Sequence, residues 1–295
     1  MESRFGRVLT AMISPFSSDG SLDLDGARTL AKWLVEQGND GLVIAGTTGE
    51  SPTLTHEEQT DLIAAVVDSV EVPVIAGAGS NDTRAAIELT QRCAEAGAAG
   101  ILTVTPYYNR PSQLGLIEHF SQIAAATELP VMLYDIPARS GRKIETSTVL
   151  QLADEVENIV SLKDAAGSVE ETERLIAAAP PGFEVYSGED ALTLPLLSVG
   201  AVGTVSVASH WATPETVRLV KAFFRGDTQE ATEINSRLLA SYEFESGDLT
   251  PNPIPTKAMM NVLNLPGGNC RLPMGPEPEW LAEKAREILY GLGRS

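Results

Sequence analysis

A lysine lies inside the stretch NIVSLKDAAG, residues 158–167, whose apolar and β-branched residues are typical of a buried strand. Lysines are scarce in this chain, at six of its 21 basic residues. A buried ammonium is costly, which leaves two interpretations of Lys163 open. Either it pairs with a carboxylate, such as Asp135 or Asp164, or it loses its proton and serves as an amine nucleophile toward a ketone or aldehyde.

Alternation along this strand predicts two faces. The bulkier face suits packing against helices and carries Val160 and Leu162. The opposite face suits the interior of a barrel and carries Ile159, Ser161, Lys163 and Ala165.

Hydroxyl groups lie in two other strand-like regions. Thr47 and Thr48 occupy the glycine-flanked turn GTTGE (46–50), where backbone N–H groups and hydroxyls can bind a carboxylate without a lysine. The alternative for both is a tight turn that caps the following helix. Tyr134 offers a hydroxyl for proton transfer, or packs in the core with that hydroxyl hydrogen-bonded.

An arginine and two tyrosines follow strand-like runs as well. Arg139 comes after a proline turn, where a guanidinium can bind a carboxylate or simply lie on the surface. Tyr107 and Tyr108 fit a core, an interface or a catalytic role. A Schiff-base enzyme needs proton shuttles and a clamp for its substrate's carboxylate, so these neighbours favour a nucleophilic Lys163 over a buried ion pair.

Strand-like and helix-like segments alternate along most of the chain. The eight strand-like runs cover residues 8–16, 41–46, 73–79, 100–108, 130–137, 159–165, 183–188 and 200–209. Helical periodicity fills the intervals at 24–37, 55–70, 81–96, 112–127, 146–154, 169–178, 191–199 and 214–224. This α/β alternation predicts a (β/α)8 TIM barrel, whose active site lies at the carboxyl ends of the strands.

The pattern changes after Arg225. Helical stretches at 227–245, 254–263 and 277–292 follow without strands between them. We therefore expect a catalytic barrel over residues 1–225 and a C-terminal all-helical domain over residues 226–295. The dinucleotide fingerprint and the phosphate-loop lysine are absent from the sequence, so no nucleotide site is expected.

The composition describes an acidic globular chain of 295 residues with a formal net charge of −19. This charge disfavours nucleic acid as a partner and repels anionic substrates at long range, so an anion site must be built from local donors. The acidic surface fits a salty cytoplasm and ordinary solubility equally well.

Targeting and metal patterns are missing from the sequence. No apolar run is long enough to span a bilayer, and the N-terminus lacks a secretory-signal pattern, so we expect a cytoplasmic protein without a membrane partner. The two cysteines have no disulfide or metal spacing, which fits a reducing compartment. The histidines also lack a metal-ligand spacing; they are His56, His119 and His210.

Together the motifs resemble the dihydrodipicolinate synthases, a branch of the pyruvate-dependent class I aldolase family. The resemblance runs nearly end to end. Its most specific block is TPYYNRPSQ (105–113), whereas GTTGE alone marks only the wider family. The other blocks are PVIAGAGSN (73–81), LYDIPARSG (133–141), LKDAAG (162–167), YSGED (186–190), PNPIPTKAMM (251–260) and RLPMGP (271–276).

The resemblance implies a reaction. Lys163 forms an imine with pyruvate, and loss of a methyl proton gives an enamine that attacks L-aspartate-4-semialdehyde. The semialdehyde's amine then displaces Lys163 as the ring closes. No metal and no organic cofactor is implied, because the lysine provides the electron sink.

The resemblance also implies roles for the other candidates. The proton relay comprises Tyr134, Thr47 and Tyr108. Tyr108 matches the member that is donated across a tight dimer interface, within a homotetramer built as a pair of such dimers. Substrate-binding positions are Thr48 with Thr47 for the pyruvate carboxylate, Arg139 for the semialdehyde carboxylate, and Gly188 and Val205 lining the pocket.

Part of a feedback site for lysine is also matched, at Ser51, His56, Asn81 and Tyr107. Gln59 replaces a histidine there, and Ala85 replaces an acid that would meet the effector's ammonium. Losing such a charge-assisted bond costs about 1–3 kcal/mol, so inhibition by lysine is expected to be weak or absent. Asp135 is a further departure, since many bacterial members have Asn; it either influences Lys163 or holds Arg139.

Three other functions stay open at this point. N-acetylneuraminate lyase and the 2-keto-3-deoxy sugar acid aldolases share the scaffold and the lysine but use another acceptor, and the lyase typically has Ser at the position of Thr48. A catalytically silent sensor on this fold would be expected to lack Lys163. A phosphate-binding isomerase barrel would need a basic phosphate grip near 187–193 and 206–211, where no arginine or lysine occurs.

Overall fold

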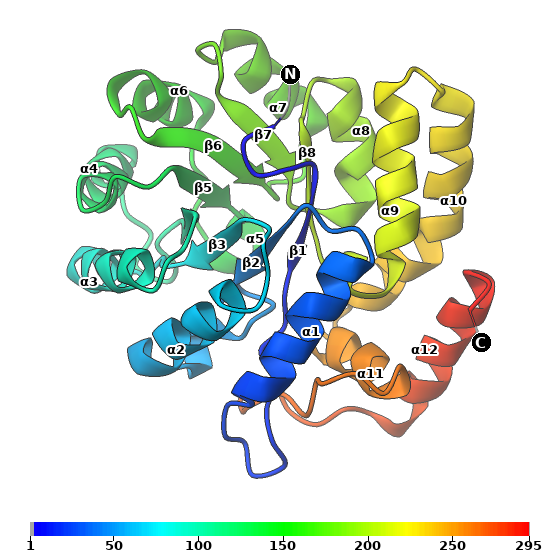
Figure 1. Cartoon of the computed structure of the whole chain (residues 1–295). Coiled ribbons are helices and arrows are strands. Elements are labelled where there is room, and N and C mark those ends of the chain that lie inside the picture. The colour runs from blue at the N-terminus through cyan, green and yellow to red at the C-terminus, as the bar shows by residue number, and fades with distance from the viewer. Residues whose placement is uncertain (1–2, 295) are drawn as a thin grey trace.

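The computed structural model describes residues 3–294. At its centre is a closed barrel of eight parallel strands, each neighbouring the next along the chain, with helices around it (Figure 1). The strands are β1 (Val8–Ala11), β2 (Gly41–Ile44), β3 (Val74–Gly77), β4 (Gly100–Val104), β5 (Val131–Asp135), β6 (Ile159–Asp164), β7 (Glu184–Ser187) and β8 (Gly203–Ser206). The predicted TIM barrel is confirmed, with one strand inside each strand-like run.

Helices follow the strands in the predicted alternation, and one further short helix after β5 was not predicted. They are α1 (Leu24–Glu36), α2 (His56–Val67), α3 (Thr83–Glu95), α4 (Gln113–Ala124), α5 (Pro137–Ser140), α6 (Thr146–Glu155), α7 (Val169–Ala178), α8 (Thr193–Ser198) and α9 (Ser209–Phe224). Short 3-10 turns, η1 (Ser51–Thr53) and η2 (Asp190–Leu192), lie before α2 and α8. Several helices begin at a short polar side chain that accepts from the first turn, as Thr55 does in the capping box of α2.

The start of α9 differs from the prediction. The sequence placed it at Pro214, but the helix begins at Ser209 and continues through that proline. Ala212 has a non-helical φ of −118°, so the helix is kinked just before Pro214. The kink lets the ring of Pro214 fit inside the helical segment, where it would otherwise clash with the preceding turn.

Three more helices follow the barrel: α10 (Thr228–Glu245), α11 (Ile254–Val262) and α12 (Glu279–Gly291). In Figure 1, α10 lies alongside α9 on the outside of the ring, and α11 and α12 lie next to each other. The all-helical character of this appendage is as predicted. The division into domains at residues 225 and 226 stays a prediction.

Two apolar clusters fill the molecule, one between the strands and the helices and one inside the barrel. Members of the inner cluster are Phe5, Leu9, Ala11, Val43, Ile75, Leu102, Met132, Tyr134, Ala165, Tyr186 and Val205. The predicted faces of β6 hold for Leu162 and Ala165 but are wrong at its beginning. The β5–β6 register shifts beside Val131, which puts Ile159 in the outer cluster and packs Val160 against the inner one.

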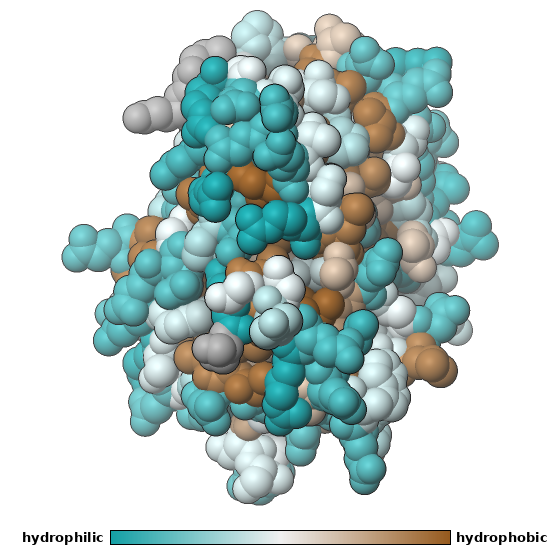
Figure 2. Space-filling model, turned by 90° about the vertical axis from the view of Figure 1, so that its right-hand side faces the viewer, coloured by the Kyte–Doolittle hydropathy of each residue, from teal (hydrophilic) through white to brown (hydrophobic). Residues whose placement is uncertain are grey.

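Hydrophilic side chains cover most of the face shown in Figure 2, with hydrophobic ones in small patches among them. This surface agrees with the net charge of −19. Among residues 3–294, none of the helices combines the length and the hydropathy that a bilayer crossing requires.

Candidate active site

Lys163 lies near the carboxyl end of β6 and is 4% exposed. Its Nζ is 4.3 Å from the ring centre of Tyr134, its cross-strand neighbour on β5. Neither carboxylate that the sequence offered as a partner is paired with it. Asp135 binds Lys143, and Asp164 accepts from Thr172 and from the Ala166 N–H. The buried ion pair is therefore wrong for both aspartates.

Gly188 closes one side of Lys163. A Cβ added to Gly188 would lie 2.9 Å from both Cγ and Cε of Lys163, and 3.1 Å from the Cβ of Ala165. The lysine stem thus occupies the space that any other residue's side chain would need. A glycine here lets Lys163 hold its conformation against the β7 end.

Thr47 and Tyr134 line one small cavity at the carboxyl ends of the strands, beside the backbone of Gly77 and Gly79. Val205, on β8, belongs to the same interior cluster as Tyr134. The lysine, the two hydroxyl groups and the predicted lining residues come from strands β5, β6 and β8 and from the turns after β2 and β7.

Asn252, which sequence reasoning missed, joins the two predicted carboxylate sites. Its Nδ2 donates to Thr48 Oγ1 at 2.9 Å, and its backbone carbonyl accepts from Arg139 Nη2 at 3.4 Å. Thr48 is 3% exposed, whereas Arg139 is exposed at the rim. Asn252 lies in the block PNPIPTKAMM that carries the family resemblance, but no local pattern in the sequence predicted its contacts with Thr48 and Arg139.

The turn that carries Thr47 and Thr48 is held by the C-terminal helices. Glu50 ends this turn with a left-handed φ of 55°, which costs roughly 1–2 kcal/mol for a residue with a side chain. Its carboxylate is 2.6 Å from Lys257 Nζ on α11, and both side chains are 2% exposed or less. Burial lowers the pKa of Lys257, and Glu50 opposes that shift. The ion pair thus fixes the turn from the outside.

Tyr108 does not join this group within one chain. Its side chain is 90% exposed, and its backbone has a left-handed φ of 73°. The backbone N–H donates to the Ser140 carbonyl at 3.3 Å, which fixes the loop but leaves the ring in solvent. The predicted relay is therefore incomplete in the single chain.

The residues of the predicted effector site follow three neighbouring strands: Ser51 and His56 come after β2, Asn81 after β3 and Tyr107 after β4. Asn81 Nδ2 donates to the Tyr107 carbonyl at 3.1 Å, and Gln59 Nε2 donates to the Ser51 carbonyl at 2.9 Å. His56 is the first residue of α2 and is half-buried. No finding tests whether this region binds an effector, so its role stays a prediction.

The buried histidines are structural. Burial lowers the pKa of His119 and of His210 to about 4 each. His210 Nε2 accepts from the Ile13 N–H at 3.0 Å, and His119 Nδ1 lies 2.9 Å from the hydroxyl of Thr83. Within residues 3–294, no three acidic, histidine or cysteine side chains are grouped so as to hold a metal ion.

The closed (β/α)8 barrel carries a buried lysine at the end of β6 with no carboxylate of residues 3–294 at ion-pair distance, an arrangement that fits a lyase of the class I aldolase type. A model of the dihydrodipicolinate synthetase family matches residues 4–290. The chain belongs to this family.

Relatives and solved structures agree with this assignment. The chain is 49% identical to the 4-hydroxy-tetrahydrodipicolinate synthase of Moorella thermoacetica, over 92% of each chain. It is 50% identical to the synthase of Acidothermus cellulolyticus, over 98% of this chain and 93% of that one. The crystal structure of the enzyme from Cyanidioschyzon merolae with lysine bound superposes with a TM-score of 0.95, at 43% identity and 99% coverage of both chains.

Proposed function

We propose that this protein catalyses the condensation of pyruvate with L-aspartate-4-semialdehyde, the 4-hydroxy-tetrahydrodipicolinate synthase reaction of the diaminopimelate route to lysine. The observation that carries the proposal is Lys163, buried beside Tyr134 with no carboxylate of residues 3–294 at ion-pair distance, in a chain 49% and 50% identical to two synthases of that name.

The chemistry begins when Lys163 Nζ attacks the ketone carbon of pyruvate. Water leaves to give an imine, and loss of a methyl proton gives an enamine whose carbon attacks the aldehyde. The semialdehyde's amine then attacks the imine carbon, and Lys163 departs as the ring closes. Tyr134 and Thr47, which line one cavity, are proposed to carry the protons.

Local donors account for the binding of two anions by an acidic protein. The backbone and hydroxyls of Thr47 and Thr48 are proposed to hold the pyruvate carboxylate, and Arg139 that of the semialdehyde. Asn252 contacts Thr48 and Arg139, which supports a fixed spacing between the two anions. Gly188 and Val205 are proposed to line the pocket between them.

Assembly is proposed to complete the relay. Tyr108 is 90% exposed on a left-handed backbone, which supports insertion into the pocket of a second copy of the chain. We therefore propose tight dimers that pair into a homotetramer, working in the cytoplasm without metal or organic cofactor.

The proposal is tested by a coupled assay with pyruvate and aspartate-4-semialdehyde, alongside borohydride reduction with pyruvate and mass mapping. Turnover and a reduced pyruvate adduct on Lys163 are expected. Absence of the adduct would favour the catalytically silent sensor. An adduct with turnover only on N-acetylmannosamine or on a sugar-acid aldehyde would favour the other aldolases of this scaffold.

Lysine is expected to inhibit weakly or not at all. Ala85 provides no carboxylate for the effector's ammonium, which removes about 1–3 kcal/mol of binding. Initial rates over a range of lysine concentrations test this expectation, and half-inhibition below millimolar lysine would contradict it.

A further inference from the structure

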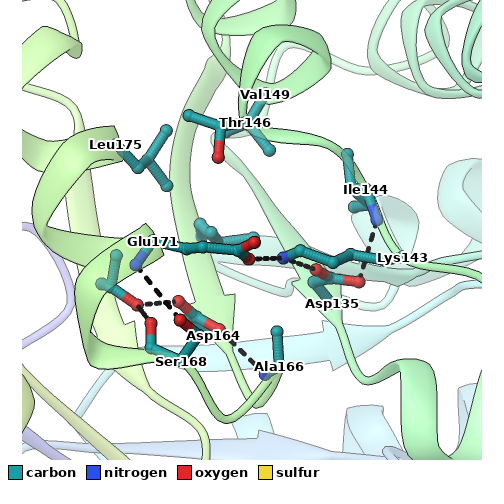
Figure 3. Close-up of a pocket in the computed structure, with 12 residues that line it drawn as sticks. Asp135, Lys143, Ile144, Thr146, Val149, Asp164, Ala166, Ser168, Glu171 and Leu175 are labelled. Carbon is teal, nitrogen blue, oxygen red and sulfur yellow. Dashed lines mark hydrogen bonds and ion pairs between the residues drawn. The ribbon is translucent and has the colours of Figure 1, made fainter.

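A small pocket lies behind the ends of β5 and β6 and is lined by charged and apolar side chains (Figure 3). The strand register pairs Tyr134 with Lys163 and the next residues, Asp135 with Asp164. Because neighbouring residues of a strand point to opposite faces, the two aspartates face outward where the tyrosine and lysine face inward. Both aspartates are buried, at 2% and 7% exposure.

Lys143 ties the end of β5 to α7. Its Nζ lies 3.3 Å from the carboxylate of Asp135 and 3.0 Å from that of Glu171 (Figure 3). The second oxygen of Asp135 accepts from the Ile144 N–H at 3.1 Å. One lysine, 36% exposed, therefore connects a strand end, the loop before α6 and a helix.

Asp164 ties the end of β6 to the same helix. Its carboxylate accepts from the hydroxyl of Thr172 at 2.5 Å and from the Ala166 N–H at 2.9 Å. Since Glu171 and Thr172 are neighbours in α7, this helix holds both strand ends from behind.

Backbone hydrogen bonds connect the two aspartates to residues that lie next to Lys163. The carbonyl of Asp135 accepts from the Ala165 N–H at 2.9 Å, and that of Asp164 accepts from the Gly188 N–H at 2.7 Å. Gly188 lies directly against the stem of Lys163, and Ala165 packs beside that glycine. A movement of either strand end would therefore reach the lysine.

Lys143 is the one cation among three carboxylates in this pocket: Asp135, Asp164 and Glu171. Burial raises the pKa of Asp135 to about 6, Asp164 adds to that shift, and Lys143 and the Ile144 N–H oppose it. Burial disfavours the charged form of Lys143, but Asp135 and Glu171 outweigh it, so the pKa of Lys143 is raised. The anchoring of β5 to α7 thus depends on Lys143.

We propose that Lys143 is a positioning residue for imine formation, which holds the ends of β5 and β6 through Asp135 and Glu171 so that Lys163 stays against Tyr134. This inference rests on the proposed function. The sequence suggested two roles for Asp135, to influence Lys163 or to hold Arg139. The inference assigns it a third, because its carboxylate pairs with Lys143 and with neither of those residues.

The test compares Lys143→Met and Lys143→Arg with Lys284→Met. Lys284 pairs with Glu287 on the exposed surface of α12, which makes it a matched control. Each protein is mixed with saturating pyruvate and quenched with borohydride over time. Mass spectrometry gives both the rate constant of adduct formation on Lys163 and the final fraction trapped.

Lys143→Met is expected to lower the rate constant about 10-fold, because a small misplacement of a reacting group is costly to rate. The fraction trapped and the KM for pyruvate should stay within about twofold, since the proposed carboxylate site at Thr47 and Thr48 lies in the turn after β2. Lys143→Arg should recover most of the rate, and Lys284→Met should match the wild type.

A merely structural role would lower the fraction trapped and the Tm but leave the rate constant of the folded fraction unchanged. A Lys143→Met rate constant within twofold of the wild type would overturn the proposal, as would an equal loss in Lys284→Met. If wild-type protein forms no adduct on Lys163, the proposed function fails, and the inference fails with it. The wild-type reaction therefore separates the two failures.

Discussion

Two lysines of this chain are almost wholly buried, and their surroundings differ. Lys257 is 2% exposed, lies 2.6 Å from Glu50 and donates to the Asn269 carbonyl at 3.1 Å. Lys163 is 4% exposed and faces the ring of Tyr134, and among residues 3–294 no carboxylate lies within ion-pair distance of it. Burying an ammonium is costly in both places. One lysine is paired with a carboxylate, whereas the other is not, which suits the nucleophile proposed above.

The largest expected effect is that of Lys163→Ala. Adduct formation with pyruvate should be abolished, because the nucleophile is gone. The free energy of unfolding should stay within about 1 kcal/mol of the wild type or rise, since no buried partner is left unpaired. Borohydride trapping and urea denaturation measure the two quantities. Persistent turnover at the wild-type rate would refute the assignment of this lysine.

Gly188→Ala should have the second-largest effect on adduct formation. The new Cβ would lie 2.9 Å from the stem of Lys163, so the lysine must move. We expect the rate of adduct formation to fall about 100-fold, with a stability loss of about 1–3 kcal/mol from overpacking. Time-resolved trapping measures this change. Gly247→Ala, at a position with open space, serves as the control, and equal rates in the two variants would show that Gly188 does not set the lysine's position.

Lys257→Met should lower the free energy of unfolding strongly, whereas Lys163→Ala should not. Removing one partner of a buried ion pair costs about 3–5 kcal/mol, because Glu50 is left charged and unpaired. The double change Glu50→Gln with Lys257→Met should recover most of that loss. Denaturant unfolding gives the free energy of unfolding of both variants. If Lys257→Met is as stable as the double variant, Lys257 does not compensate a buried charge on Glu50.

A pH-dependent effect is expected at the half-exposed third lysine, Lys143, and its partner Asp135. The pKa of Asp135 is about 6 in the folded state against an ordinary 3.8, so the folded protein binds this proton more tightly. Stability from this group is therefore greatest below about pH 4 and is lost as pH rises through 6, by on the order of 3 kcal/mol.

Asp135→Asn removes that titration. Unfolding free energies measured between pH 4 and pH 7 should fall with pH more steeply in the wild type than in the variant. Parallel curves for the two proteins would show that Asp135 does not titrate in this window.

Much of the barrel was predictable from the sequence, because strand and helix periods are local properties. The position of candidate residues such as Lys163 and Thr47 near one rim was predictable, because a barrel collects strand ends there, whereas their roles stay a proposal. Three features were not predictable. The register shift at Val131 depends on pairing between strands. The contacts of Asn252 with Thr48 and of Lys257 with Glu50 join residues more than 200 positions apart in the chain.

The contact between Asn252 and Thr48 has a consequence for how this protein is made. The two residues lie 204 positions apart, and Arg271 reaches Glu50 across 221. Chains leave the ribosome at roughly 5–20 residues per second, so the turn that carries Thr48 emerges many seconds before the segment that fixes it. The strands and the lysine can be in place on the ribosome while the turn still lacks its supports. The turn therefore gains these supports only when almost the whole chain has been translated.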